Sequence, residues 1–95
     1  MSITLLINFK VKPEKLEAFT ELLAGVQTDL PGKGGCKDIR ILRNIDEETA
    51  IALVESWASK ADHQAHFDEI VASGAWDHVK SHLVAEPSRG YYSEG

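Results

Sequence analysis

The sequence predicts an α+β domain of the ferredoxin-like kind, with the element order β-α-β-β-α-β and both helices on one face of an antiparallel sheet. Two kinds of observation support this fold class. Segments rich in β-branched residues alternate with segments whose apolar residues recur every three or four positions. Breaks that contain Gly or Pro separate them. The 95 residues, 1–95, form a single domain without an internal repeat or a linker.

The first half of the chain predicts a strand, a helix and a second strand. Residues 3–12 are rich in β-branched and aromatic side chains and end at Pro13, which suits the first turn of a helix. From Pro13 to about Asp29 the apolar spacing is that of an amphipathic helix. The segment LPGKGG at 30–35 ends this helix, and the alternating residues 36–43 predict the next strand.

The predicted hairpin that follows contains a strand that is apolar on both faces, which indicates how the domain could form a dimer. A turn at 44–48 leads to the run TAIALVESW at 49–57, which is apolar on both faces and therefore predicts a central strand. The strand at 3–12 also has apolar residues on both faces. Because two helices cover only one face of a sheet, the other face would remain an exposed apolar patch. We therefore expect a homodimer through the sheet face.

The last part of the chain predicts a broken helix and a short strand. Ser59, with Asp62 three residues later, resembles a capping box and places the start of a helix near Lys60. This helix breaks at 73–74 and then resumes. Residues 86–92 allow a final strand, whose Pro87 is confined to its start or to a sheet edge.

Composition excludes several classes of partner. The formal net charge is −5 and the basic residues are scattered, so we expect no nucleic acid partner. No apolar run is long enough to span a membrane, and the N-terminal residues do not resemble a signal peptide. The single cysteine, Cys36, fits a reducing compartment, and we expect a cytoplasmic protein in which it is a small buried hydrophobe.

Four short segments resemble the antibiotic biosynthesis monooxygenase (ABM) domains, which are dimeric α+β barrels. They are VKPEKLEAF at 11–19, GGC at 34–36, ESW at 55–57 and AHF at 65–67. The resemblance covers essentially the whole chain. It implies a cofactor-independent monooxygenase that acts on a small aromatic ligand, of phenol or hydroquinone type, in a pocket between sheet and helices. A non-catalytic dimeric small-molecule-binding protein, an isomerase and a haem-degrading enzyme remain alternatives within the superfamily.

The same resemblance implies three catalytic residues. Asn8 would hydrogen-bond a substrate oxyanion, Trp57 would form a flat wall and His66 would take the proton. Each has a structural alternative: a solvent-facing strand residue for Asn8, a core residue for Trp57 and a half-buried helix-border residue for His66. The three share one pocket only if Asn8 and Trp57 point to the helix-facing side. Strand parity opposes this if Ile3, Leu5, Ile7 and Phe9 face the helices.

Metal and nucleotide sites are not expected. His78 and His82 are four residues apart, but no third ligand occurs at a defined spacing, so His63, His78 and His82 are expected to be solvated. The segment GKGG lacks the ending of a phosphate-binding loop and does not open a helix. We therefore expect no metal and no nucleotide, flavin or nicotinamide cofactor.

Overall fold

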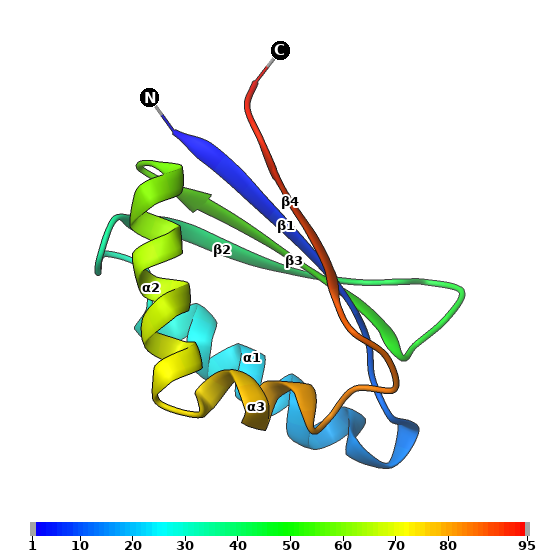
Figure 1. Cartoon of the computed structure of the whole chain (residues 1–95). Coiled ribbons are helices and arrows are strands. Elements are labelled where there is room, and N and C mark those ends of the chain that lie inside the picture. The colour runs from blue at the N-terminus through cyan, green and yellow to red at the C-terminus, as the bar shows by residue number, and fades with distance from the viewer. Residues whose placement is uncertain (1, 95) are drawn as a thin grey trace.

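The computed structural model describes residues 2–94 and has the predicted α+β architecture, with its helices on one side of an antiparallel sheet (Figure 1). The elements in chain order are β1 (Ile3–Lys10), a 3₁₀ turn (Pro13–Lys15), α1 (Leu16–Asp29), β2 (Cys36–Arg43), β3 (Ala50–Trp57), α2 (Lys60–Ala72), α3 (Ala75–Lys80) and β4 (Ser88–Tyr92).

The sheet has the order β2-β3-β1-β4, so β3 is flanked on both sides, as its apolar faces predicted. The register pairs Ile3 with Trp57 and Asn8 with Ala52. Paired residues of an antiparallel sheet point to the same face, and successive residues alternate between faces. This register therefore fixes which side chains of β1 and β3 share a face.

Two strand ends differ from the sequence-based prediction, for identifiable reasons. The strand β1 ends at Lys10 rather than at Lys12, because the backbone N–H groups of Val11 and Lys12 bond to Thr49 and His82 instead of to a strand partner. The strand β4 begins at Ser88 rather than at residue 86. The preceding Pro87 has no N–H to donate to the sheet.

Local signals set the ends of α2 as predicted. The Ser59 side chain accepts a hydrogen bond from the backbone N–H of Asp62 at 3.1 Å, which caps the helix. Gly74, with a φ of 86°, separates α2 from α3. Gly35, with a φ of 94°, lies so close to α2 that a Cβ there would stand 2.4 Å from an oxygen of Asp62. The loop before β2 can therefore pack against the start of α2 only with glycine at this position.

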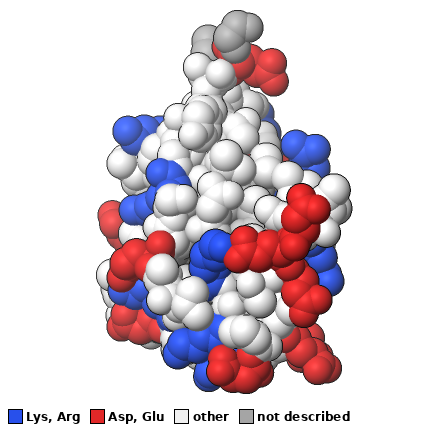
Figure 2. Space-filling view, turned by 90° about the vertical axis from the view of Figure 1, so that its right-hand side faces the viewer, with Lys and Arg blue, Asp and Glu red and all other residues white. Residues whose placement is uncertain are grey.

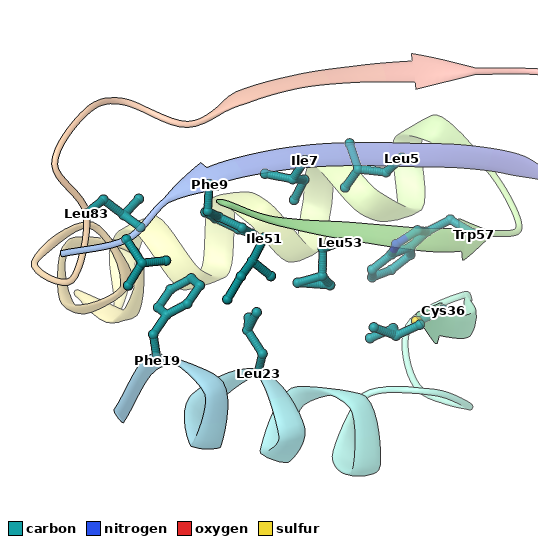
Figure 3. Packing of buried hydrophobic residues seen from close by; sticks show 12 residues of the cluster. Leu5, Ile7, Phe9, Phe19, Leu23, Cys36, Ile51, Leu53, Trp57 and Leu83 are labelled. Atoms are coloured by element: carbon teal, nitrogen blue, oxygen red, sulfur yellow. The ribbon is translucent and has the colours of Figure 1, made fainter. Parts of the chain in front are cut away.

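The core lies between the sheet and α1. Figure 3 shows Leu53 of β3 pointing toward α1, from which Phe19 and Leu23 point back toward the sheet. Cys36 is part of the same cluster, as predicted for a small buried hydrophobe. Burial raises the pKa of its thiol to about 11, so it stays uncharged at neutral pH.

No helix of residues 2–94 covers the other side of the sheet. The register brings Leu6, Val54 and Leu42 of three neighbouring strands to this open face, and Leu42 is 48% exposed. Tyr92 of β4 lies on the same face and is 57% exposed. Figure 2, which views the molecule from the right-hand side of Figure 1, shows positive and negative side chains interspersed around uncharged surface, without an extended basic patch in this view. No helix of residues 2–94 is long and apolar enough to cross a membrane.

Candidate functional site

A cavity of about 240 Å³ lies between the helix-facing side of the sheet and the helices. Its size falls between the roughly 150 Å³ that holds benzene and the roughly 300 Å³ at which pockets for drug-sized ligands begin. The lining comes from β1 and β3 and from all three helices, and it is predominantly apolar: Ile7, Phe9, Leu22, Leu23, Val26, Leu30, Leu53, Glu55, His63, His66, Phe67, Ile70, Ala75, Trp76, His78 and Val79. The cavity therefore suits a ligand of one or two aromatic rings.

Aromatic side chains from the two C-terminal helices form one side of this cavity. Phe67 of α2 and Trp76 of α3 meet edge to face, with ring centroids 5.0 Å apart. Sequence reasoning assigned the flat wall to Trp57 and gave Trp76 no part in the site. Trp57 has no exposed surface and is not among the lining residues. Phe67 and Trp76 form the aromatic side of the cavity instead, and Phe9 of β1 adds a third aromatic ring to the lining.

Glu55 is the unexpected polar group of the site. It stands two residues before Trp57 on β3, so both side chains point toward the helices, and Glu55 is only 6% exposed. Its Oε1 accepts a hydrogen bond from the Trp57 indole at 2.8 Å. Burial raises the pKa of Glu55, and the bond from Trp57 acts in the opposite direction. Trp57 therefore positions a carboxyl group that lines the cavity.

Sequence reasoning missed Glu55, although a signal was present. In the run 49–57, strand parity places Glu55 on the same face as the apolar residues Ile51, Leu53 and Trp57. A charged residue on the buried face of a central strand is rare unless it is paired or functional. The alternation of residues along this strand was therefore sufficient to predict Glu55 as a candidate site residue.

His66 lies in the cavity lining, as the resemblance implied. Its ring centroid is 5.3 Å from that of Trp57, and the imidazole makes no hydrogen bond to any of residues 2–94. Burial lowers the pKa of His66, and the nearby Glu69 carboxylate acts in the opposite direction. The side chain is therefore a neutral imidazole near pH 7 with a ring nitrogen available to a ligand.

His63 lies deeper than was predicted. It was expected to be solvated, but it is 3% exposed, and its Nδ1 lies 2.6 Å from the hydroxyl of Tyr91 on β4. Burial lowers the pKa of His63 to about 4, and the positive charges of Arg89 and His66 add to this effect. The error has a simple origin: α2 turns the face that carries His63 toward the sheet and β4.

Further contacts link α2 to β4 beside the cavity. The Lys60 ammonium lies 5.0 Å from the centroid of the Tyr91 ring, and the Arg89 guanidinium lies 3.9 Å from that of the Phe67 ring. With the His63–Tyr91 contact, they attach the outer side of α2 to the edge strand of the sheet.

Asn8 does not join the other predicted site residues. The register places Asn8 opposite Ala52, while Trp57 lies opposite Ile3 on the other face of the sheet. Asn8 is exposed on the open face, in a separate hollow of about 450 Å³ that it shares with Lys10, Arg43 and Glu47. The prediction that Asn8, Trp57 and His66 converge in one pocket is therefore wrong. Leu5, Ile7 and Phe9 occupy the helix-facing positions, and alternation turns Asn8 away.

The two histidines near the end of α3 differ in exposure: His78 is exposed, as expected, whereas His82 is buried. His82 was expected to be solvated, but it is 6% exposed, its Nδ1 lies 2.8 Å from the carbonyl oxygen of His78, and its ring packs against Phe19. Within residues 2–94, no group of three or more His, Cys, Asp or Glu side chains is arranged to hold a metal ion. His78 lines the cavity at its α3 side.

The fold and the cavity together define a class of protein: a ferredoxin-like α+β domain with a small, largely apolar ligand pocket between sheet and helices. Residues 2–82 match the antibiotic biosynthesis monooxygenase family. The chain belongs to this family, as its sequence segments indicated. No curated protein matches the chain.

Solved structures share the fold over nearly the whole chain. A conserved protein from Methanosarcina mazei Go1 has a TM-score of 0.87 at 18% identity, covering 100% of this chain and 94% of that chain. Rv0793 from Mycobacterium tuberculosis has a TM-score of 0.85 at 16% identity, covering 100% and 96%. SO0527 from Shewanella oneidensis has a TM-score of 0.82 at 22% identity, covering 98% and 90%. At these identities the likeness shows the fold alone.

Proposed function

We propose that the protein is a cofactor-independent monooxygenase that acts on a small aromatic substrate, a phenol or hydroquinone, bound in the cavity between sheet and helices. One observation carries the proposal. A largely apolar cavity of about 240 Å³ contains a half-buried imidazole, His66, that has no hydrogen-bond partner among the described residues. Membership of a family named for monooxygenases agrees with it.

The chemistry asks little of the protein beyond binding and proton removal. The His66 ring nitrogen takes the proton of a substrate hydroxyl, and the electron pair of the broken O–H bond stays on the substrate oxygen. The resulting electron-rich anion passes electrons to dioxygen. The product is a quinone: one oxygen atom replaces a ring hydrogen, the O–O bond breaks, and the other oxygen leaves as water with two protons from the substrate. The substrate therefore supplies all four electrons that dioxygen takes up. The apolar lining excludes water from this sequence.

Oxygen uptake with a panel of phenols and hydroquinones tests the activity. We expect turnover by the wild type, and a loss of about 10²–10⁴-fold in His66→Ala, the range for a missing general base. Metal and flavin analysis of the same preparation should return no stoichiometric metal, flavin or nicotinamide. An absence of uptake with every substrate, or an unchanged rate in His66→Ala, would contradict the assignment.

A non-catalytic binding protein is the second candidate, and the position of Asn8 favours it. The amide that was expected to stabilise a substrate oxyanion lies on the opposite face of the sheet from the cavity. Saturable binding of an aromatic ligand without oxygen uptake would support this candidate.

We also propose that the open face of the sheet is the interface of a homodimer. Leu6, Leu42, Val54 and Tyr92 contribute apolar surface to this face from four neighbouring strands. Ala52 and Gly90 lie between them and would let a second sheet approach closely. Sedimentation equilibrium at micromolar concentration should give twice the chain mass of 10.5 kDa.

A further inference from the structure

Glu55 brings a carboxyl group into a space where no positive side chain offsets it. Among the described residues that line the cavity, Glu55 is the only acid, and none is Lys or Arg. The remaining titratable groups of the lining are the imidazoles of His63, His66 and His78. Burial lowers the pKa of both His63 and His66, so neither supplies a positive charge at pH 7 or above.

The surrounding elements do not neutralise Glu55 either. On β2, the apolar Ile39 lies opposite Glu55, and the Glu55 charge contributes to the raised pKa of the nearby Cys36 thiol. From β4, the Arg89 guanidinium stacks on Phe67 and lines a separate hollow with Gln64 and Asp68. Among residues 2–94, the one side chain that donates a hydrogen bond to the carboxyl group is the uncharged indole of Trp57.

The second carboxyl oxygen remains accessible to a ligand. Oε1 is bonded to the Trp57 indole, and no described residue donates a hydrogen bond to Oε2. Within residues 2–94, every side-chain oxygen or nitrogen sealed from solvent in a residue that is not exposed has a partner. Oε2 therefore retains accessible surface. Since Glu55 lines the cavity, this oxygen can accept a hydrogen bond from a ligand bound there and would repel a negative group.

We propose that Glu55 makes the cavity selective for uncharged aromatic ligands that present a hydroxyl or amide N–H, and excludes aromatic carboxylates and phosphates. This inference rests on the proposed binding of a small aromatic in the same cavity. It adds that negatively charged aromatic compounds are excluded from the cavity, and that Glu55 is the residue that excludes them. Discrimination of this kind arises from a repulsive group placed against the wrong ligand as much as from contacts to the right one.

Three probes with the same two rings separate charge from shape: 2-naphthol, 2-naphthamide and 2-naphthoate. Binding is measured by calorimetry at pH 8, where the naphthoate is ionised and the naphthol is still largely protonated. For the wild type we expect the naphthol and the naphthamide to bind at least tenfold more tightly than the naphthoate. Because naphthamide and naphthoate have nearly the same shape, a difference between their affinities for the wild type can be attributed to the charge of the naphthoate.

Glu55→Gln then tests the residue. Glutamine keeps an oxygen that can accept the Trp57 hydrogen bond but removes the charge. We expect the affinity for naphthoate to rise at least tenfold and the preference for naphthamide to shrink accordingly. Glu69→Gln is the matched control, since Glu69 is an exposed carboxylate on α2 that does not line the cavity, and it should leave the preference unchanged.

The outcomes separate this inference from the proposed function. If none of the three probes binds, the proposed ligand site fails, and the selectivity fails with it. If naphthamide and naphthoate bind equally to the wild type, the cavity is supported as a binding site for aromatic ligands, but the proposed role of Glu55 is overturned. An affinity for naphthoate that is lost in Arg89→Gln and indifferent to Glu55→Gln would also overturn it, by placing the anion in the hollow beside Arg89.

Discussion

The two faces of the sheet are formed by the same strands but differ in burial and in the role of their side chains. On the helix-facing side, Leu5 and Trp57 have no exposed surface, and the polar group among them, Glu55, is held by a hydrogen bond. On the open side, Asn8 is exposed, Leu6 is half-buried, and both lie on the same strand as Leu5. The comparison shows that one step along a strand separates a core or site residue from a surface or interface residue. Four predictions follow from this contrast, from the largest expected effect to the smallest.

A charge at Leu5 should abolish folding. Leu5 is fully buried in the core between the sheet and α1, so Leu5→Asp leaves an unpaired carboxylate in an apolar environment. We expect a loss of more than about 5 kcal/mol in the free energy of unfolding, which is as large as the whole stability of a marginally stable domain of this size. Circular dichroism should show the loss of the native spectrum. A folded, cooperative Leu5→Asp protein would contradict the assignment of this face to the core.

Acid should destabilise the protein through His63 on the helix-facing side. Its pKa is about 4 in the folded chain, against an ordinary value near 6.5, so the unfolded chain binds more protons between these values. Stability should therefore fall as the pH drops from about 6.5 to 4, by on the order of 2–3 kcal/mol from this residue.

Urea unfolding at pH 4 and at pH 7 measures the effect of His63. His63→Gln keeps an amide that can bond to Tyr91 but cannot titrate, so the fall in stability should be smaller. Glu55 acts in the opposite sense, since a raised carboxyl pKa favours the folded state at low pH. The difference between wild type and variant isolates His63. An identical pH dependence in the two proteins would mean that His63 is not buried as a neutral group.

A charge at Leu6 should separate subunits without unfolding them. Leu6 lies on the open face, between Val54 and Gly90 of the neighbouring strands. We expect Leu6→Asp to retain its circular dichroism spectrum while the dissociation constant of the proposed dimer rises at least tenfold, or about 1.4 kcal/mol. Ala24→Glu, at an exposed position of α1, is the control and should sediment as the wild type does. If Leu6→Asp sediments as the wild type does, the interface lies elsewhere.

Removing the Asn8 side chain should change ligand binding least. Because Asn8 lies on the opposite face from the cavity, Asn8→Ala should alter the affinity for 2-naphthol by less than about twofold, which is under 0.4 kcal/mol. Calorimetry under the conditions used for the wild type measures this. A tenfold loss would indicate that Asn8 influences the cavity through the sheet.

Most of the fold could be predicted from local signals in the sequence. Apolar spacing, the Ser59 cap and the break at Gly74 act within one or two turns of the chain, and the structure contains each of them. The site was harder to predict, because it depends on which face each polar residue occupies. Parity in the run 49–57 would have identified Glu55, while the orientation of Asn8 also required knowledge of which face of β1 meets the helices.

The contact between His63 and Tyr91 illustrates what the sequence does not contain. It joins residues 28 positions apart on α2 and β4. Whether a helical residue meets a distant strand depends on the rotation of the helix about its axis. The packing of the whole α2 face sets that rotation, and this face has few apolar residues to mark its buried side.

The strand β4 has a consequence for the rate at which a ligand reaches the cavity. It is only five residues long and lies at a sheet edge, so its hydrogen bonds are expected to open at a lower free energy than those of β1 or β3. Such an opening would also separate Tyr91 from His63 and Arg89 from Phe67, and so would loosen α2 over the cavity. Amide hydrogen exchange along β4 would report these events, and exchange as slow as that of β1 would argue against them. The opening rate of β4 would then limit the rates at which a ligand binds and dissociates, independently of the affinity of the site.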